Sequence, residues 1–158
     1  MRFSKKLIVS LVVVLAVSFL IGEVATKFKT AADFVNEAKA VIKEISVDEA
    51  FEIYKSRDEK YIFLDVREAD EVEAGHIPDA QWIPRGLLEF KISSLVKPTD
   101  GKVIIVYCKT GGRSALAAKT LKEMGYEAWS MAGGFTEWSS KKLPFRRGLP
   151  GTTGGGCG

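Results

Sequence analysis

The segment Val103–Met124 constrains the fold more than any other part of the sequence. It opens with VIIVY, an apolar run of β-branched and aromatic residues without alternation, which is typical of a strand buried on both faces of a sheet. Residues 108–112 (CKTGG) are too rich in glycine for regular structure, and apolar residues then recur at helical spacing at Ala117, Leu121 and Met124. The segment therefore predicts a strand, a tight loop and a helix, which Gly125 ends.

Cys108 occupies the position in this segment where a negative charge is best stabilised. It follows the strand directly, and the loop behind it leads into a helix N-terminus, where N–H groups converge and the helix dipole favours anions. Lys109 and Arg113 add positive charge, and such surroundings favour an ionised thiol. We therefore expect Cys108 to hold an anion on sulfur, either a thiolate or a persulfide. A purely structural cysteine would not need two glycines and flanking cations beside it.

Length, charge and composition exclude several classes of function. The chain of 158 residues is long enough for one domain with a full core and an extension. Its net charge is +3, and part of that excess lies in the first 25 residues, so nothing indicates a nucleic-acid partner. One histidine, His76, and two cysteines, Cys108 and Cys157, cannot assemble a zinc site of Cys and His ligands. We therefore expect no metal.

The N-terminus has the pattern of a targeting signal. Arg2, Lys5 and Lys6 precede Leu7–Ile21, which is apolar except for two serines. This pattern predicts an export signal or a membrane anchor within residues 1–25, with the basic end in the cytoplasm and the domain outside it. The run is long for the apolar part of a signal peptide and short for a comfortable span, and Glu23 makes a poor cleavage site. An uncleaved anchor is favoured, and a cleaved signal with a periplasmic domain remains the alternative.

Two further segments flank the predicted domain. Residues 26–44 alternate charges with apolar residues at helical spacing, which predicts an amphipathic helical linker. Its apolar stripe could pack on the domain, pair with a second copy or lie on a membrane surface. Residues 146–158 contain six glycines and no periodic apolar pattern, which predicts a flexible tail.

Between these flanks, strands alternate with helices. Ser46 and Glu49 form a capping box that starts a helix, and further strands are predicted at 61–66, 80–83 and 127–131. Helices are predicted at 67–74, at 86–95 and after Gly133. This alternation predicts an α/β domain over residues 45–145, with a parallel sheet covered by helices on both faces. Because ligands bind at the carboxyl ends of such strands, we expect Asp65 and Cys108 to share one pocket.

Four motifs occur in order: LDVR at 64–67, GHIP at 75–78 with Ala80 and Ile83-Pro84, Cys108–Ser114, and Gly133-Gly134 with Trp138. With these motifs the chain resembles a single-domain rhodanese, a sulfurtransferase, from about Ile45 to Leu143. The departures from the family pattern are Val72, Asp79 and Trp82, which lie outside the active loop.

The resemblance implies a rhodanese-like fold and a double displacement. Cys108 attacks the outer sulfur of a small anionic donor such as thiosulfate, becomes a persulfide, and passes that sulfur to a thiol or another thiophilic acceptor. No cofactor is implied beyond this covalent intermediate. The persulfide would be surrounded by the N–H groups of the loop residues Lys109, Thr110, Gly111, Gly112, Arg113 and Ser114.

The resemblance also assigns supporting residues, with alternatives. Arg113 orients the loop and attracts anions, or it satisfies carbonyl groups beneath the loop. Asp65 holds the loop or Arg113 by charge-assisted hydrogen bonds, or it caps the helix that follows. Arg67 is expected to form a structural ion pair with Glu71, and His76 a structural hydrogen bond.

Two other functions compete with sulfur transfer. Phosphatases on the same fold have five residues between the cysteine and the arginine, whereas four separate Cys108 from Arg113, which favours a sulfur atom over a phosphoryl group. Non-catalytic binding or sensor modules of the family have lost the cysteine, which this chain keeps. Cys157, in the predicted tail, is either inert or a partner that receives sulfur from Cys108 or forms a disulfide with it.

Overall fold

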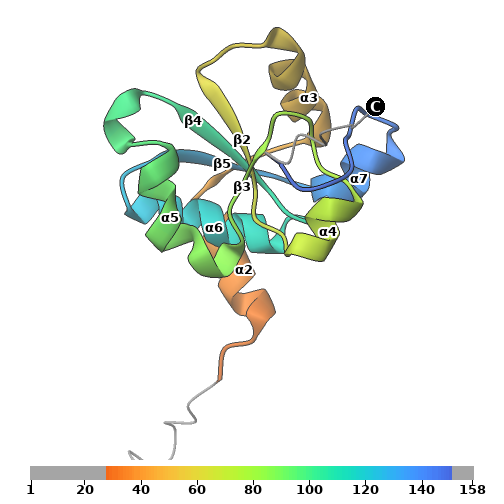
Figure 1. Cartoon of the computed structure of the whole chain (residues 1–158). Helices are drawn as coiled ribbons and strands as arrows, with labels where there is room; N and C mark the ends of the chain where they lie inside the picture. Colours follow the sequence, from red (N-terminus) through yellow and green to blue (C-terminus); the bar gives the residue numbers. More distant parts are fainter. Residues whose placement is uncertain (1–27, 151–158) are drawn as a thin grey trace, which may run out of the picture. The chain divides into compact units, whose positions relative to one another are not determined.

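The domain is built around a parallel sheet of five strands, in the order β1-β5-β4-β2-β3 (Figure 1). The computed structural model describes residues 28–150. All five residues of the central strand are buried, as its uninterrupted apolar run predicts. The predicted α/β sheet is therefore confirmed. The strands are β1 (Lys43–Ile45), β2 (Tyr61–Asp65), β3 (Gln81–Trp82), β4 (Val103–Tyr107) and β5 (Glu127–Met131).

Helices cover both faces of the sheet. On one face lie α3 (Val47–Ser56) and α7 (Gly134–Ser140). On the other lie α5 (Leu88–Leu95) and α6 (Gly112–Glu123), and α2 (Ala31–Lys39) packs against α6. The short helix α4 (Ala69–Ala74) follows the carboxyl end of β2. Two 3₁₀ turns complete the order, η1 (Arg85–Leu87) and η2 (Pro98–Asp100).

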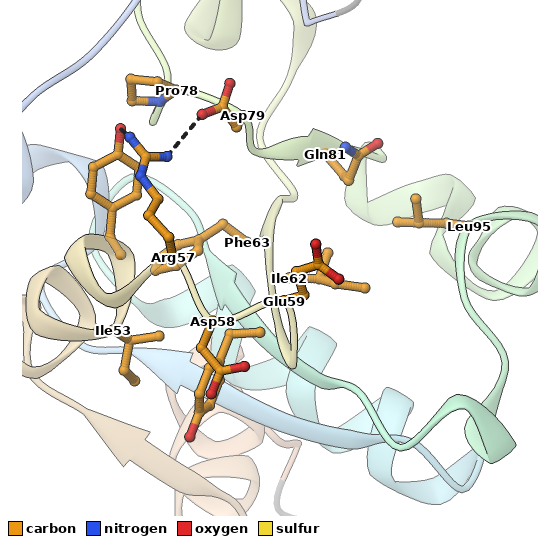
Figure 2. Close-up of a pocket in the computed structure, with 12 residues that line it drawn as sticks. Ile53, Arg57, Asp58, Glu59, Ile62, Phe63, Pro78, Asp79, Gln81 and Leu95 are labelled. Atoms are coloured by element: carbon orange, nitrogen blue, oxygen red, sulfur yellow. Dashed lines mark hydrogen bonds and ion pairs between the residues drawn. The ribbon is translucent and has the colours of Figure 1, made fainter.

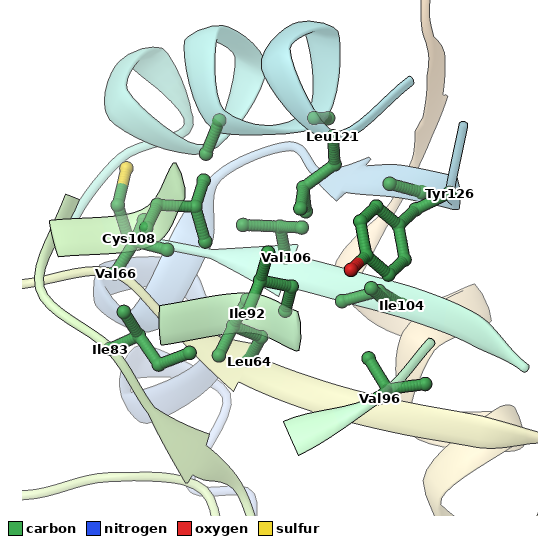
Figure 3. Packing of buried hydrophobic residues seen from close by; sticks show 14 residues of the cluster. Leu64, Val66, Ile83, Ile92, Val96, Ile104, Val106, Cys108, Leu121 and Tyr126 are labelled. Carbon is green, nitrogen blue, oxygen red and sulfur yellow. The ribbon is translucent and has the colours of Figure 1, made fainter. Parts of the chain in front are cut away.

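Each face has its own apolar core. Figure 3 shows the cluster beneath α6, in which Leu64 and Val106 of the sheet meet Ile92 of α5 and Leu121 of α6. Cys108 belongs to this cluster and lies at one end of it. The opposite face is organised around Trp138, which is completely buried. Its indole meets the rings of Phe51, Tyr54 and Phe63 edge-on, at centroid distances of 5.7, 5.7 and 6.3 Å.

The ends of the helices follow the local chemistry of the sequence. The Glu49 N–H donates to Ser46 Oγ at 3.2 Å and the Ser46 N–H donates to Glu49 Oε2 at 2.8 Å, so the predicted capping box is confirmed. At the far end of α6, Gly125 has a φ of 90° and its N–H donates to the Lys122 carbonyl at 3.0 Å. The predicted glycine stop is therefore in place.

The linker differs from its prediction. The helix ends at Lys39 instead of reaching residue 44, and residues 43–45 form the edge strand β1 beside β5. Two contacts explain the change, because Ile45 is buried in the core under α3 and the Lys43 amine lies 3.3 Å from the centre of the Trp129 ring. A strand of three residues is too short to show an alternating pattern in the sequence.

The ordered chain also extends past the predicted domain end at residue 145. His76 and Arg146 form an antiparallel bridge with N–O distances of 2.8 and 2.9 Å, and the Gly148 N–H donates to the Glu73 carbonyl at 2.8 Å. The predicted flexible tail is therefore wrong for these first residues. Backbone hydrogen bonds need no particular side chain, so composition gave no sign of them.

The predicted membrane segment, residues 7–21, and Cys157 lie outside the described residues. Within residues 28–150, the helices are all too short or too polar to span a bilayer.

Replacing Leu121 by alanine should destabilise the domain by about 2–5 kcal/mol, because the side chain is completely buried between α6 and the sheet. Chemical denaturation measures the free energy of unfolding. Phe90→Ala is the control, since this ring is 82% exposed and its loss should change stability by roughly 0.5 kcal/mol or less. Equal losses in the two variants would contradict the packing described.

Candidate active site

The thiol of Cys108 lies where β4 runs into α6. The residue is only 2% exposed, and Figure 3 shows its sulfur pointing toward the first turn of α6. The Gly111 N–H donates to Sγ at an N–S distance of 3.2 Å. Gly111 has a φ of 108°, a conformation that residues with a Cβ rarely adopt, so this position of the loop favours glycine.

Two buried hydroxyl groups lie behind the sulfur. The Cys108 S–H donates to Ser114 Oγ at 3.7 Å, and the Ser114 hydroxyl donates to the Gly111 carbonyl at 3.0 Å. Ser130, on β5, lies 2.9 Å from Ser114 through its own hydroxyl. Both serines are completely buried. The sequence motif includes Ser114, whereas Ser130 comes from a strand that gave no sign of a role.

The loop after Cys108 has several further backbone N–H groups without a partner in the described part of the chain. No acceptor within residues 28–150 pairs with the N–H groups of Lys109, Thr110 and residues 112–114. The side chains of Lys109 and Thr110 are exposed. Unpaired N–H groups at the start of a helix can bind an anion.

The first turn of α7 holds this loop in shape. The Phe135 N–H donates to the Cys108 carbonyl at 2.8 Å and the Thr136 N–H donates to the Lys109 carbonyl at 3.0 Å. Helix α7 comes so close to the loop that residue 134 must be glycine, because a Cβ there would lie 2.5 Å from the Cys108 carbonyl oxygen. The Gly133-Gly134 motif therefore holds the carbonyl side of the loop.

Asp65 and Arg67 form a buried ion pair with each other. Arg67 Nη2 lies 2.6 Å from Asp65 Oδ2, and the guanidinium also donates to the carbonyl groups of Gly75 and Glu71 at 2.7 and 3.1 Å. Its Cζ atom lies 4.2 Å from the centre of the Phe135 ring. Asp65 therefore neither touches Arg113 nor caps α4, whose cap is Glu68. Both predicted roles of Asp65 are wrong.

Glu71 pairs with Arg113, so the predicted ion pair between Arg67 and Glu71 is also wrong. Arg113 Nη1 and Nη2 lie 2.7 Å from the two carboxylate oxygens of Glu71, in a bidentate contact between α6 and α4. The hydrogen bond from Arg113, more than any other contact, lowers the pKa of Glu71, and the hydrogen bond with Glu71 raises the pKa of Arg113. Both groups are therefore charged at neutral pH.

Two other polar residues near the site are structural. His76 is buried, and its Nδ1 lies 3.3 Å from the Val72 carbonyl, which matches the predicted structural hydrogen bond. Tyr107 is completely buried, and its hydroxyl accepts from the Ile77 N–H at 3.2 Å. Burial raises the pKa of Tyr107 well above its ordinary value, and the Asp65 charge adds to that effect. Tyr107 is therefore a neutral phenol.

A surface cavity of about 280 Å³ lies away from this site, beside the beginning of β2 (Figure 2). An ion pair between Arg57 and Asp79 crosses its rim at 3.1 Å. The cavity adjoins Tyr61 and Phe63, at the amino end of β2, whereas Cys108 follows the carboxyl end of β4. In the described part of the chain, no three Cys, His, Asp or Glu side chains gather as a metal site requires.

Gly134→Ala should destabilise the domain by about 1–3 kcal/mol or more, because residue 134 has a φ of 58° and the new Cβ would collide with the Cys108 carbonyl. It should also change the alkylation rate of Cys108, measured by peptide mapping. Gly86→Ala is the matched control, since a Cβ at Gly86 meets nothing within 4 Å. If the two variants behave alike, α7 does not hold the loop.

The sequence and the fold have well-defined relatives. Residues 49–141 match the Rhodanese-like domain family. YtwF of Bacillus subtilis, named provisionally as a sulfurtransferase, is 35% identical over 65% of this chain and 96% of its own length. A protein named sulfurtransferase from Allochromatium vinosum is 32% identical over 54% of this chain and 78% of its own. YrkF of Bacillus subtilis, named provisionally as a sulfur carrier, is 34% identical over 76% of this chain, and the match spans 64% of YrkF.

Solved structures agree with these matches. A protein of unknown function from Rhodopseudomonas palustris, described as a possible tyrosine phosphatase, superposes with a TM-score of 0.69 and 33% identity over 75% of this chain and 95% of its own. A rhodanese-related protein from Thermoplasma volcanium gives a TM-score of 0.58 and 29% identity over 66% and 97% of the two chains. Because the domain match covers more than half of the sequence and the fold agrees with it, the chain belongs to the rhodanese-like domain family, whose members include proteins named sulfurtransferases.

Proposed function

We propose that the protein is a sulfurtransferase that moves a sulfane sulfur from an anionic donor such as thiosulfate to a thiophilic acceptor, through a persulfide on Cys108. The observation that carries this proposal is the surroundings of Sγ. One N–H, that of Gly111, already donates to the sulfur, and the N–H groups of the neighbouring loop residues find no acceptor within residues 28–150. These donors suit an anion on sulfur, or on the sulfur atom that extends it.

In the first half-reaction the Cys108 thiolate attacks the outer sulfur of thiosulfate. A sulfur–sulfur bond forms to Cys108, the bond between the outer sulfur and the sulfonate group breaks, and sulfite leaves with the electron pair. The products are a persulfide monoanion on Cys108 and sulfite, so charge and atoms balance. The loop N–H groups stabilise the charge on the outer sulfur, which requires no cofactor or metal.

In the second half-reaction a thiolate acceptor attacks the outer sulfur of the persulfide. The acceptor becomes a persulfide and Cys108 returns as a thiolate. Because Cys108 is only 2% exposed, the outer sulfur of the persulfide is the atom that an acceptor would reach. Small thiols or other small thiophilic molecules therefore suit the site. Lys109, with its exposed side chain, provides a positive charge at the entrance.

Phosphoryl transfer is the less suitable use of this loop. Four residues, 109–112, lie between Cys108 and Arg113, which leaves one residue fewer than the related phosphatases place around a tetrahedral phosphate. Hydrolysis of a phosphate ester, without sulfur uptake, would be the result that favours that function.

Incubation of the protein with excess thiosulfate, followed by removal of the donor, should add the mass of one sulfur atom to Cys108. Intact-mass spectrometry with peptide mapping measures the product. Cys108→Ser should remain folded and take up no sulfur at that position, because the hydroxyl has nearly the same volume but cannot form a persulfide. Cys157→Ser is the matched control and should react like wild type; sulfur uptake that vanishes in this variant instead would remove Cys108 from the mechanism.

We also propose that residues 7–21 direct the domain out of the cytoplasm, as an uncleaved anchor or as a cleaved signal peptide. The basic residues before this apolar run support that orientation. In a bacterial host, protease added to spheroplasts should then digest the domain. A cytoplasmic marker protein serves as the control, and full protection of the domain together with that marker would contradict the orientation.

A further inference from the structure

Glu71 occupies the hydrogen-bonding edge of Arg113 that an oxyanion would use. Both terminal nitrogens of Arg113 donate to Glu71 at 2.7 Å, and Glu71 also accepts from the Glu68 N–H at 3.2 Å. The side chains of Glu71 and Arg113 are 23% and 33% exposed, so the pair lies partly shielded from water. The two N–H groups in this contact point at Glu71, so an oxyanion that needs the same paired geometry on Arg113 has to displace the carboxylate.

Arg113 lies in the first turn of α6, toward which the Cys108 sulfur points (Figure 3). The charge of the Cys108 thiolate contributes to the raised pKa of Arg113, after the larger effect of Glu71. The pKa of Glu71 is lowered mainly by Arg113, with help from the Glu68 N–H and the charge of Arg67, although partial burial opposes this shift. Glu71 therefore carries a negative charge at neutral pH, held on the terminal nitrogens of Arg113.

The other cations do not replace Arg113. Arg67 is buried, and its donors are used by Asp65 and by two carbonyl groups. Lys109 has no carboxylate within ion-pair distance among residues 28–150, and it is one exposed charge. The site can thus accept a single negative charge on sulfur, through its N–H groups, more readily than a second charge on adjacent oxygen atoms.

We propose that Glu71 determines donor specificity by competing with sulfonate oxygens for Arg113, so that the site favours hydropersulfide donors over thiosulfate. This inference rests on the proposed sulfurtransferase function. With a hydropersulfide R–S–SH, the Cys108 thiolate attacks the outer sulfur and the bond between the two donor sulfurs breaks. R–S⁻ leaves and takes the proton of the outer sulfur, which gives R–SH and the Cys108 persulfide anion. No oxyanion has to be placed beside Glu71 in this reaction.

The test compares two small donors, thiosulfate and 2-hydroxyethyl hydropersulfide, in sulfur loading of Cys108 by the full chain. Rapid quenching and mass spectrometry measure the second-order loading rate constant for each donor. Wild type should load faster from the hydropersulfide. Glu71→Gln should raise the rate constant for thiosulfate about tenfold or more, the size expected when one charge-assisted contact becomes available. The rate constant for the hydropersulfide should change less than about threefold.

Two further variants identify the cause of the change. Glu73→Gln removes the same charge from the same helix, and its side chain makes no hydrogen bond or ion pair to Arg113. It should behave like wild type. The double variant Glu71→Gln with Arg113→Gln should lose the gain for thiosulfate, because the freed guanidinium is gone. Glutamine at 71 keeps an oxygen that can accept from the Glu68 N–H, which preserves the start of α4.

Failure of this inference differs from failure of the proposed function. If wild type gains no sulfur on Cys108 from either donor, both are overturned. If wild type is loaded but prefers thiosulfate, only the specificity role of Glu71 is overturned. An equal effect of Glu71→Gln on both donors, or a gain that persists without Arg113, would also reject that role. The donor preference of the wild type, hydropersulfide or thiosulfate, tests the inference even if a variant does not fold.

Discussion

The contact between the first turn of α7 and the loop after Cys108 is the constraint on which the site depends. Two N–H groups at the start of α7 bind the carbonyls of Cys108 and Lys109 at 2.8 and 3.0 Å. With their carbonyl groups engaged on that side, the peptide units of the loop direct N–H groups elsewhere, and that of Gly111 reaches the sulfur. The position of α7 depends in turn on Trp138, at the centre of the aromatic core. The aromatic core on one face of the sheet therefore fixes where the loop N–H groups lie at the carboxyl end of β4.

Arg67 and Arg113 differ in how they are held. Arg67 is buried, paired with Asp65 and stacked on Phe135, so it belongs to the core. Arg113 is partly exposed and paired with Glu71 across two helices. Replacing a buried charge partner leaves the other charge unsatisfied, whereas a partly exposed pair can separate at a lower cost. Adaptation to a ligand is therefore expected at Arg113 and not at Arg67.

The sequence predicted the elements whose signals are local. The unbroken apolar run of β4 and the capping box of Ser46 and Glu49 depend on neighbouring residues, and both are present in the structure. Strand β1 and the bridge at Arg146 were not predicted, because both depend on backbone hydrogen bonds to residues far away in the sequence. The partners of Asp65 and Glu71 were wrong for a similar reason. Arg67 and Arg113, which belong to different motifs, are both candidates for each carboxylate, and only the path of α4 decides which one it meets.

The Ser114 hydroxyl can respond when the charge on the Cys108 sulfur changes. It donates to the Gly111 carbonyl while the thiol is protonated, and Ser130 lies on its other side. When the sulfur becomes an anion, a rotation about one single bond can turn the Ser114 proton toward it, without movement of the backbone. A rotating dipole of this kind keeps the reorganisation energy of the site small. The site can then accommodate a neutral thiol and an ionised sulfur in turn, which is what the proposed persulfide chemistry would need.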